Sequence, residues 1–346
     1  SEQGIKVTVF SYSTNAGQTY EEDGITVIRT HVKNGSLWRW YLAVDIFLKN
    51  NRFTVIEDAD YQGSAWLYQL LHRRKEDYIH LRLHTCTKLI ARFEGGTTLL
   101  KEAKVAAMNL IERYNAKKAN LISAPSIAIA DLTAALWKIE NDQIAYLPLP
   151  FRINTAEPAT SVNGGDYLLY FGRIQQRKGA DVFLKMIAKD FLKDSGLKLK
   201  LIGNDICSFE KKLKQINNQT AQSVIIESRV YDRESIIPDI SRAKVIILPS
   251  HFESFGLTAL EALWFNPKTF VLSNSGPREV MTALQLESNL LDEASLVDNP
   301  EYIWGKINQA VPELTEIRQR INDNFGYQKI AGQLKAILES RGISIT

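Results

Sequence analysis

The chain has 346 residues, of which 45% are hydrophobic and 23% charged, with a formal net charge of +3. This balance is typical of a soluble globular enzyme, and the charge is too small to indicate nucleic-acid binding by itself. The length fits two domains better than one. We recognise neither a membrane-spanning apolar run nor a signal peptide, and neither Cys86 nor Cys207 has metal-ligand spacing. We therefore expect a cytoplasmic protein with reduced thiols.

Short apolar segments rich in β-branched residues alternate with amphipathic segments of helical length. The former predict buried parallel strands at 5–10, 54–57, 79–83, 120–123, 167–171, 197–202, 223–227, 244–248 and 269–272, with a further strand at 25–29. The latter predict helices at 101–118, 180–190, 209–217, 257–265 and 327–340. Alternation of strand and helix indicates an α/β fold with doubly wound domains.

A proline-rich stretch at 146–166 marks the expected domain boundary. We predict an N-terminal Rossmann-like domain over 1–150, a C-terminal one over 151–325, and a last segment, 326–346, whose helix packs back across the boundary. A doubly wound domain usually opens with a strand and a glycine-rich turn that holds phosphate. Here the sequence starts at what reads as a second strand, so we expect that first strand and loop to be absent.

Two acids flank a glycine turn directly after the strand that ends at 248. Glu253 precedes Gly256, and Glu261 lies about two turns into the helix that follows. Ser254 is a candidate helix cap, and the backbone amides of 256–258 would then point at an anion such as a diphosphate. The alternative is an ordinary surface helix with two solvated acids.

Two basic residues follow the strand at 167–171. Arg173 stands at its carboxyl end and Lys178 begins the next helix, so both lie at the sheet edge where ligands of such folds bind. A guanidinium and an ammonium together neutralise a diphosphate, although a solvated basic loop is the alternative. After the next two strands come Gly203-Asn204 and Arg229-Val230, which could frame a nucleobase.

The order and spacing of these motifs over 166–277 resemble the retaining glycosyltransferases of the GT-B fold, specifically the large family 4, or group 1. The shared pattern is G-R-x4-K-G, then G-N, then E-x7-E. The resemblance implies two Rossmann-like domains facing across a cleft. Its implied donor-binding set is Arg173, Lys178, Gly203, Asn204, Arg229, Val230, Glu253, Ser254, Phe255, Gly256, Leu257, Thr258 and Glu261.

The resemblance also implies roles. Arg173 and Lys178 would hold the donor phosphates and stabilise the leaving diphosphate, while Glu253 would contact the donor sugar and Glu261 the ribose. Amides near 256–258 would bind the distal phosphate, and the base would lie near Val230 with Arg229 stacking on it. His84, after a strand of the N-terminal half, resembles the family's cleft histidine, with a core or capping histidine as the alternative. The implied catalytic set is Glu253, Arg173, Lys178 and His84.

The implied reaction moves a hexose from a nucleoside-diphosphate sugar, with UDP favoured, to a glycan or lipid-linked acceptor in polysaccharide biosynthesis. We expect no cofactor, metal ion or nucleic acid to take part. Two alternatives stay open: a nucleotide-sugar epimerase of the same fold, and a non-catalytic nucleotide-sugar-binding protein. Basic runs at 72–75 and 88–92 are typical of peripheral contact with the inner face of a membrane. The alternative is that they form a solvated helix face.

Overall fold

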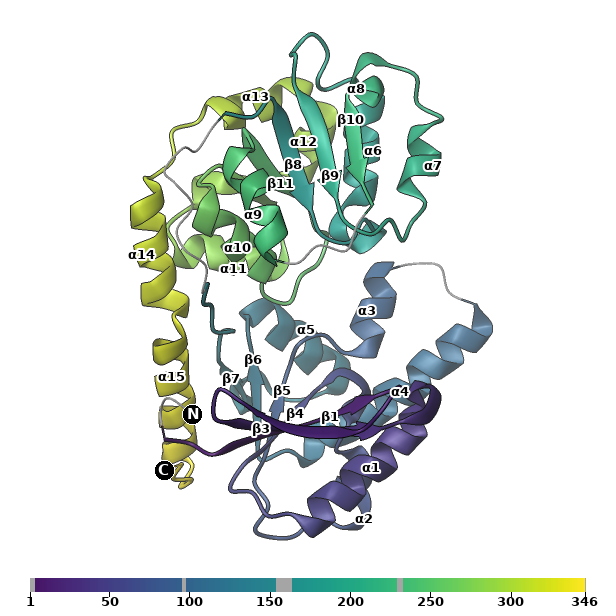
Figure 1. The fold of residues 1–346 in the computed structure, drawn as a ribbon, viewed down its shortest axis with the longest axis vertical. Coiled ribbons are helices and arrows are strands. Elements are labelled where there is room, and N and C mark those ends of the chain that lie inside the picture. Colours follow the sequence, from purple (N-terminus) through teal and green to yellow (C-terminus); the bar gives the residue numbers. More distant parts are fainter. Residues whose placement is uncertain (1–3, 95–97, 154–163, 229–232, 346) are drawn as a thin grey trace.

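The computed structural model describes residues 4–94, 98–153, 164–228 and 233–345. It has two α/β domains, one above the other in Figure 1, and the predicted fold class is confirmed. The core of the N-terminal domain is a parallel sheet in the order β4-β5-β6-β7, formed by Ile56–Ala59, Ile79–Arg82, Leu121–Ala124 and Ile144–Tyr146. Its helices are α1 (Leu37–Asn50), α2 (Trp66–Leu71), α3 (Thr87–Glu94), α4 (Leu99–Lys118) and α5 (Ile127–Trp137).

Strands β5 and β6 are almost wholly buried because helices pack against them. Leu81 and Ile122 from these strands share one cluster with Ile129 and Trp137 of α5. Cys86, in the same cluster, is fully buried, and burial raises the pKa of its thiol to about 12, which keeps it protonated. Short 3-10 turns complete the domain at Lys33–Gly35, Tyr61–Gly63 and Asn141–Gln143.

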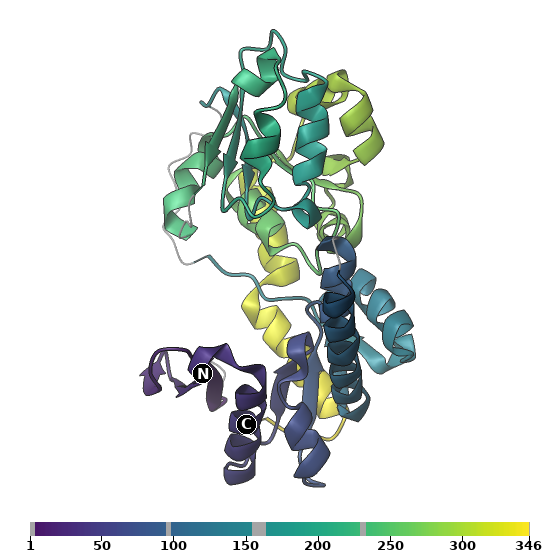
Figure 2. The same cartoon turned by 90° about the vertical axis from the view of Figure 1, so that its right-hand side faces the viewer.

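The first three strands form a separate sheet, in the order β1-β3-β2, that projects to one side of the domain (Figure 2). They are β1 (Val7–Ser13), β2 (Gln18–Glu22) and β3 (Ile25–His31). The prediction of a buried strand at 5–10 was wrong, because β1 is only half-buried along its length. Within the described residues β1 pairs only with β3 and β4 only with β5. A cavity of about 320 Å³ lies between β1 and β4, with Phe10 and Asp58 among its lining residues.

The C-terminal domain holds a six-stranded parallel sheet in the order β10-β9-β8-β11-β12-β13. The strands are β8 (Tyr167–Phe171), β9 (Lys198–Ile202), β10 (Val224–Glu227), β11 (Val245–Leu248), β12 (Thr269–Leu272) and β13 (Leu290–Leu291). If the strands of this domain are numbered from 1 at β8, the order in the sheet is 3-2-1-4-5-6, so the direction of winding reverses between β8 and β11. Ligands of such sheets bind at the carboxyl ends of the strands on either side of that point.

Helices pack around this sheet and its almost wholly apolar core. They are α6 (Ala180–Ala188), α7 (Phe209–Leu213), α8 (Gln219–Gln222), α9 (Arg233–Arg242), α10 (Leu257–Phe265), α11 (Ser275–Ala283), α12 (Glu293–Asp298) and α13 (Pro300–Asn308), with 3-10 turns at Gln176–Lys178 (η4) and Glu287–Asn289. Helix α7 is shorter than the predicted 209–217. Asn218 then caps the separate helix α8, its side chain accepting the Ala221 amide at 2.8 Å.

The last two helices, α14 (Leu314–Phe325) and α15 (Tyr327–Ser340), run from one domain to the other along one side of the molecule (Figure 1). Gly326 separates them with an extended backbone and pairs with Phe151 just after the first domain. Leu338 of α15 packs with Tyr78 and Leu121 of the N-terminal domain. None of the helices in the described part of the chain has the length and apolar character needed to cross a bilayer.

Candidate functional site

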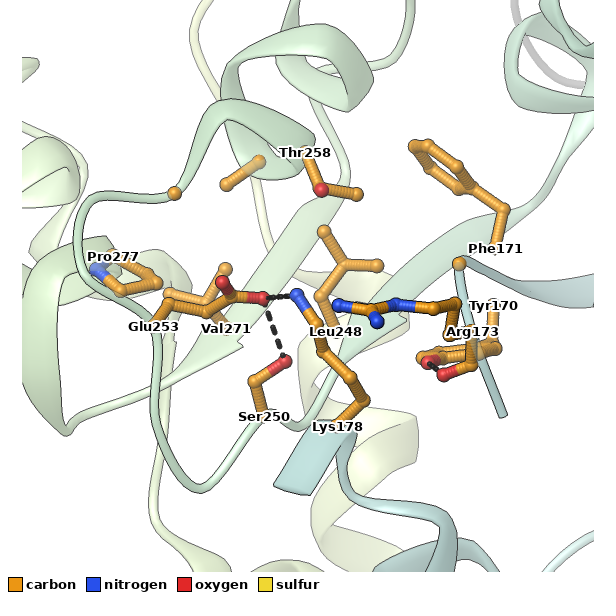
Figure 3. Close-up of a pocket in the computed structure, with 13 residues that line it drawn as sticks. Tyr170, Phe171, Arg173, Lys178, Leu248, Ser250, Glu253, Thr258, Val271 and Pro277 are labelled. Carbon is orange, nitrogen blue, oxygen red and sulfur yellow. Dashed lines mark hydrogen bonds and ion pairs between the residues drawn. The ribbon is translucent and has the colours of Figure 1, made fainter. Parts of the chain in front are cut away.

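A cavity of about 160 Å³ lies at the carboxyl ends of β8 and β11, where the sheet reverses its winding (Figure 3). It brings together five residues singled out from the sequence: Arg173, Lys178, Glu253, Gly256 and Thr258. The strands place them there because parallel strands end at one edge of a sheet. Its other lining residues, which were outside the predicted set of site residues, are Tyr170, Phe171, Gly172, Leu248, Ser250, Ala259, Val271 and Pro277.

Lys178 and Glu253 form an ion pair in the middle of this cavity (Figure 3). Their side chains are only 15% and 18% exposed. Burial lowers the pKa of the Lys178 amine, and the charges of Arg177 and Arg173 lower it further, whereas Glu253 opposes these effects. The Ser250 hydroxyl also donates to Glu253, at 3.3 Å. Ser250 could have been found from its place between the strand end and the first acid.

Arg173 adds a second positive charge. Its guanidinium points toward the Lys178 amine in Figure 3. The Tyr170 hydroxyl donates to the Arg173 carbonyl at 2.7 Å, which fixes the backbone at the strand end. Two cations against one acid give the cavity a net positive charge, so it is suited to an anion that carries more than one negative charge.

The loop between β11 and α10 differs from the prediction at Ser254, which is not a helix cap. The cap residue of α10 is Gly256, in a left-handed conformation with φ of 118°. Ser254 lies two residues too early for its hydroxyl to reach the first helical amides, and its carbonyl accepts a bond from Ser126 instead, at 2.6 Å. Gly256 and Thr258 line the cavity at the amino end of α10, where backbone amides lack acceptors within the helix.

Other residues of the predicted set lie outside the cavity lining. The Phe255 ring is buried and packs on Phe325 at 5.4 Å between ring centroids, so it belongs to the core. Leu257 and Glu261 are on α10 but do not line the cavity. Arg229 and Val230 lie outside the described residues, so their predicted role remains a prediction.

Gly203 and Asn204, at the end of β9, contact the backbone on both sides of Arg173. A Cβ at Gly203 would lie 1.9 Å from the Gly172 carbonyl oxygen, so only glycine fits at this close approach. The Asn204 carbonyl accepts the Ile174 amide at 2.9 Å. These two residues shape the backbone around Arg173, although they do not themselves line the cavity.

His84 lies in the N-terminal domain, at the carboxyl end of β5, and does not line the cavity. Asp60, which the sequence reasoning missed, fixes its backbone: a carboxylate oxygen accepts the amides of His84 at 2.9 Å and Thr85 at 3.3 Å. Asp60 is fully buried, and burial raises its pKa to about 7. Burial also lowers the pKa of His84, helped by the charge of Arg82. Asp60 directly follows β4, the position at the carboxyl end of a strand that could have indicated it.

His251 holds the β11–α10 loop to two helices. Its Nε2 lies 2.8 Å from Asp181 of α6 and its Nδ1 3.3 Å from Glu293 of α12. These three are residue types that bind metal ions, and they lie close enough to share one. However, the Lys185 amine is 3.4 Å from Asp181 and 3.7 Å from Glu293. The hydrogen bond to Asp181 raises the pKa of His251, so we interpret the cluster as an ion-pair network around an imidazolium.

The basic run at 72–75 is largely engaged within the fold. The Arg74 guanidinium donates to the carbonyls of Leu48 at 2.9 Å and Asn51 at 2.8 Å, at the end of α1. Arg73 donates to Asn120 at 2.5 Å. These contacts give the two arginines a structural role that the sequence alone did not indicate.

The comparisons with known proteins agree with this arrangement. Two family models match: "Glycosyl transferase 4-like domain" over residues 1–150 and "Glycosyl transferases group 1" over 165–303. A D-inositol 3-phosphate glycosyltransferase of an Arthrobacter species is 26% identical over 173 residues, which are 49% of this chain and 38% of that protein. The match therefore spans less than half of the relative's length.

Solved structures share the fold over nearly the whole chain. Sucrose-phosphate synthase of Thermosynechococcus elongatus superposes with a TM-score of 0.75 at 19% identity, covering 98% of this chain and 90% of that one. An α,α-trehalose-phosphate synthase (UDP-forming) of Burkholderia vietnamiensis gives 0.67 at 12% identity, covering 97% and 100%. With a family model matched on each domain and this shared architecture, the chain belongs to the group 1, or family 4, glycosyltransferases of the GT-B fold.

Proposed function

We propose that this enzyme transfers a hexose from a nucleoside-diphosphate sugar, with retention of the anomeric configuration, and that the cavity at β8 and β11 holds the donor diphosphate. The observation that carries the proposal is the convergence of Arg173, Lys178 and Glu253 at the winding reversal of the C-terminal sheet. A diphosphate needs at least two positive groups in a partly desolvated site, and these cations meet that need.

Each residue then has a distinct task. Arg173 and Lys178 neutralise the negative charge that develops on the leaving diphosphate, with help from the amides at the start of α10. Glu253 holds Lys178 in place in the empty site and, once the diphosphate competes for Lys178, turns to the hydroxyls of the donor sugar. Glu261, farther along α10, contacts the ribose, and the base lies near Arg229 and Val230.

Retention is proposed from the resemblance of the G-R-x4-K-G and E-x7-E motifs to those of the retaining enzymes. Glu253 is assigned to the hydroxyls of the donor sugar, so the proposed route forms no covalent glycosyl-enzyme. The departing phosphate oxygen takes the proton of the acceptor hydroxyl on the same face of the sugar. A base on the protein is then not required. His84 contacts the donor sugar from the N-terminal side of the cleft.

UDP is the proposed nucleotide, supported by the "UDP-forming" trehalose-phosphate synthase that shares the fold. The proposed acceptor is a glycan or a lipid-linked sugar in polysaccharide synthesis, on the cytoplasmic side of the membrane. The names of the relatives favour a second candidate, a phosphorylated sugar or inositol. Peripheral membrane contact is proposed to use surfaces other than Arg73 and Arg74, because both side chains are engaged within the fold.

Calorimetric titration of the protein with UDP, GDP and ADP tests the donor site. We expect selective binding of one of them, UDP, and release of that nucleotide from its labelled sugar donor in the presence of an acceptor. NMR of the product then reports its anomeric configuration. Failure of all three nucleotides to bind would refute the proposed donor site. Interconversion of the donor sugar without transfer would instead identify the epimerase alternative.

A further inference from the structure

Glu279 of α11, in the C-terminal domain, binds the first turn of α5 in the N-terminal domain. Its two carboxylate oxygens accept the amides of Ile127 and Ala128, each at 2.7 Å. Helix α5 has no acidic residue in its own first turn. A carboxylate at this position satisfies amides that lack acceptors within the helix and interacts favourably with the positive end of the helix dipole. Glu279 therefore ties the two domains together through a charge-assisted contact.

The same helix α11 supports the loop that carries Glu253. The Gly276 amide donates to the Glu253 carbonyl at 3.0 Å. A Cβ at Gly276 would lie 2.6 Å from the backbone of both Ser254 and Phe255, so helix and loop are in direct backbone contact. Gly276 precedes Glu279 by less than one helical turn. A shift of α11 at Glu279 is therefore expected to move the backbone of the loop at 252–255.

The N-terminal domain also holds this loop on both sides of Glu253. Phe252 is 1% exposed, belongs to the core cluster of the N-terminal domain and stacks on Phe93 of α3 at 4.3 Å between ring centroids. Ser126, which caps α5, donates to the Ser254 carbonyl at 2.6 Å. Contacts from α3 and α5 thus add to those that the C-terminal domain itself makes with the backbone at 252–255.

We propose that Glu279 is a positioning residue for the donor site. By holding α5 against α11, it fixes the backbone at 252–255 and with it the placement of Glu253 opposite Lys178. Glu279 itself does not line the cavity. The inference rests on the proposed function for the meaning of the cavity, whereas the mechanical link between α5 and the loop stands on the contacts alone. Seating of the N-terminal domain and binding of the donor diphosphate are then energetically coupled.

The test compares Glu279→Ala and Glu279→Gln with Asn299→Ala. Asn299 also accepts a helix amide, that of Glu301 at 3.0 Å, but at α13, the end of the domain away from the N-terminal domain (Figure 1). The first readout is hydrogen–deuterium exchange of peptides covering 249–256 in the nucleotide-free protein. The second is the dissociation constant for UDP by calorimetry.

We expect Glu279→Ala to speed exchange over 249–256 and to weaken UDP binding at least about fivefold, the lower end of typical coupling between sites. Glu279→Gln retains one amide acceptor and should lie between wild type and Glu279→Ala, which keeps the test valid if the alanine variant fails to fold. Asn299→Ala should change neither readout.

Unchanged exchange over 249–256 in folded Glu279 variants would overturn the mechanical link. Faster exchange with unaltered UDP affinity would overturn the role in the donor site. If the wild-type protein binds no nucleoside diphosphate, the proposed function fails together with the donor-site role, and the exchange readout still decides whether Glu279 holds the loop.

Discussion

In the proposed donor site, the diphosphate competes with Glu253 for Lys178, and removal of either partner of this ion pair has a calculable effect. In Lys178→Ala, the diphosphate loses a charge-assisted hydrogen bond, which contributes about 1.5–3 kcal/mol. At about 1.4 kcal/mol per tenfold, this corresponds to about 10–150-fold weaker UDP binding. The loss is enlarged because Glu253, 18% exposed, loses Lys178 as its partner and lies close to the incoming anion.

The reverse substitution, Glu253→Gln, removes the competitor for Lys178. We expect UDP to bind at least as tightly as to wild type, whereas the intact sugar donor binds more weakly because its hydroxyls lose a carboxylate partner. In the double variant the penalty of Lys178→Ala should shrink, with a coupling energy of about 0.5–3 kcal/mol. Isothermal titration with UDP and with UDP-glucose for the four proteins of the cycle measures all of these terms.

A paired lysine elsewhere in the same domain provides the control. Lys198 forms an ion pair with Asp166 at 2.8 Å at the start of β9, the opposite edge of the sheet from the cavity. Lys198→Ala should leave the affinity for UDP unchanged. Wild-type affinity in folded Lys178→Ala, or strict additivity in the double variant, would refute the reasoning.

The lowered pKa of Lys178 gives the same site a pH dependence. Because burial places its folded pKa below the unfolded value of 10.5, the amine loses its proton at a lower pH than an exposed lysine does. Folding stability then rises with pH between the two values, since the cost of burying the charge disappears, while UDP affinity falls. Lys178→Arg keeps its positive charge over this pH range, so its UDP affinity should fall less with pH than that of the wild type. Titration of UDP itself affects both proteins alike and cancels in the comparison. Parallel binding curves for the two proteins between pH 7.5 and pH 10 would contradict this prediction.

Two further predictions concern the scaffold around the site. Because the pKa of His251 is raised in the folded protein, its protonation stabilises the fold below the unfolded pKa of 6.5, and this stability is lost as the pH rises through the higher folded pKa. His251→Gln should therefore lower the melting temperature at pH 6 more than at pH 9. An equal loss at both pH values would count against an imidazolium between Asp181 and Glu293. Gly203→Ala should cost at least about 2 kcal/mol of unfolding free energy in a denaturant titration, because its Cβ would meet the backbone of Gly172. Gly305→Ala, in open space on α13, should instead be neutral or stabilising by up to about 1 kcal/mol, and similar values for the two glycines would contradict the packing argument.

Local patterns in the sequence were sufficient for the fold class and for the middle of the candidate site. The strands at 167–171 and 269–272 have the predicted bounds, because each is a short apolar run closed by turn residues. Arg173 and Glu253 come together as expected because each follows a parallel strand, and such strands end at a common edge. Neither inference required knowledge of distant contacts.

Other features depend on contacts that no local pattern encodes. β1 is half-buried and lies in a separate sheet with β2 and β3, and α10 is capped at Gly256, whose backbone is left-handed. Glu279 meets the amides of α5 about 150 residues away in the chain. The sequence by itself therefore determined most strands of the two parallel sheets and the edge where the charged residues gather, since both follow from periodicity and strand order. Only the tertiary structure decided which residues hold the charged side chains in place at that edge, since contacts such as Glu279 to α5 depend on how the two domains pack.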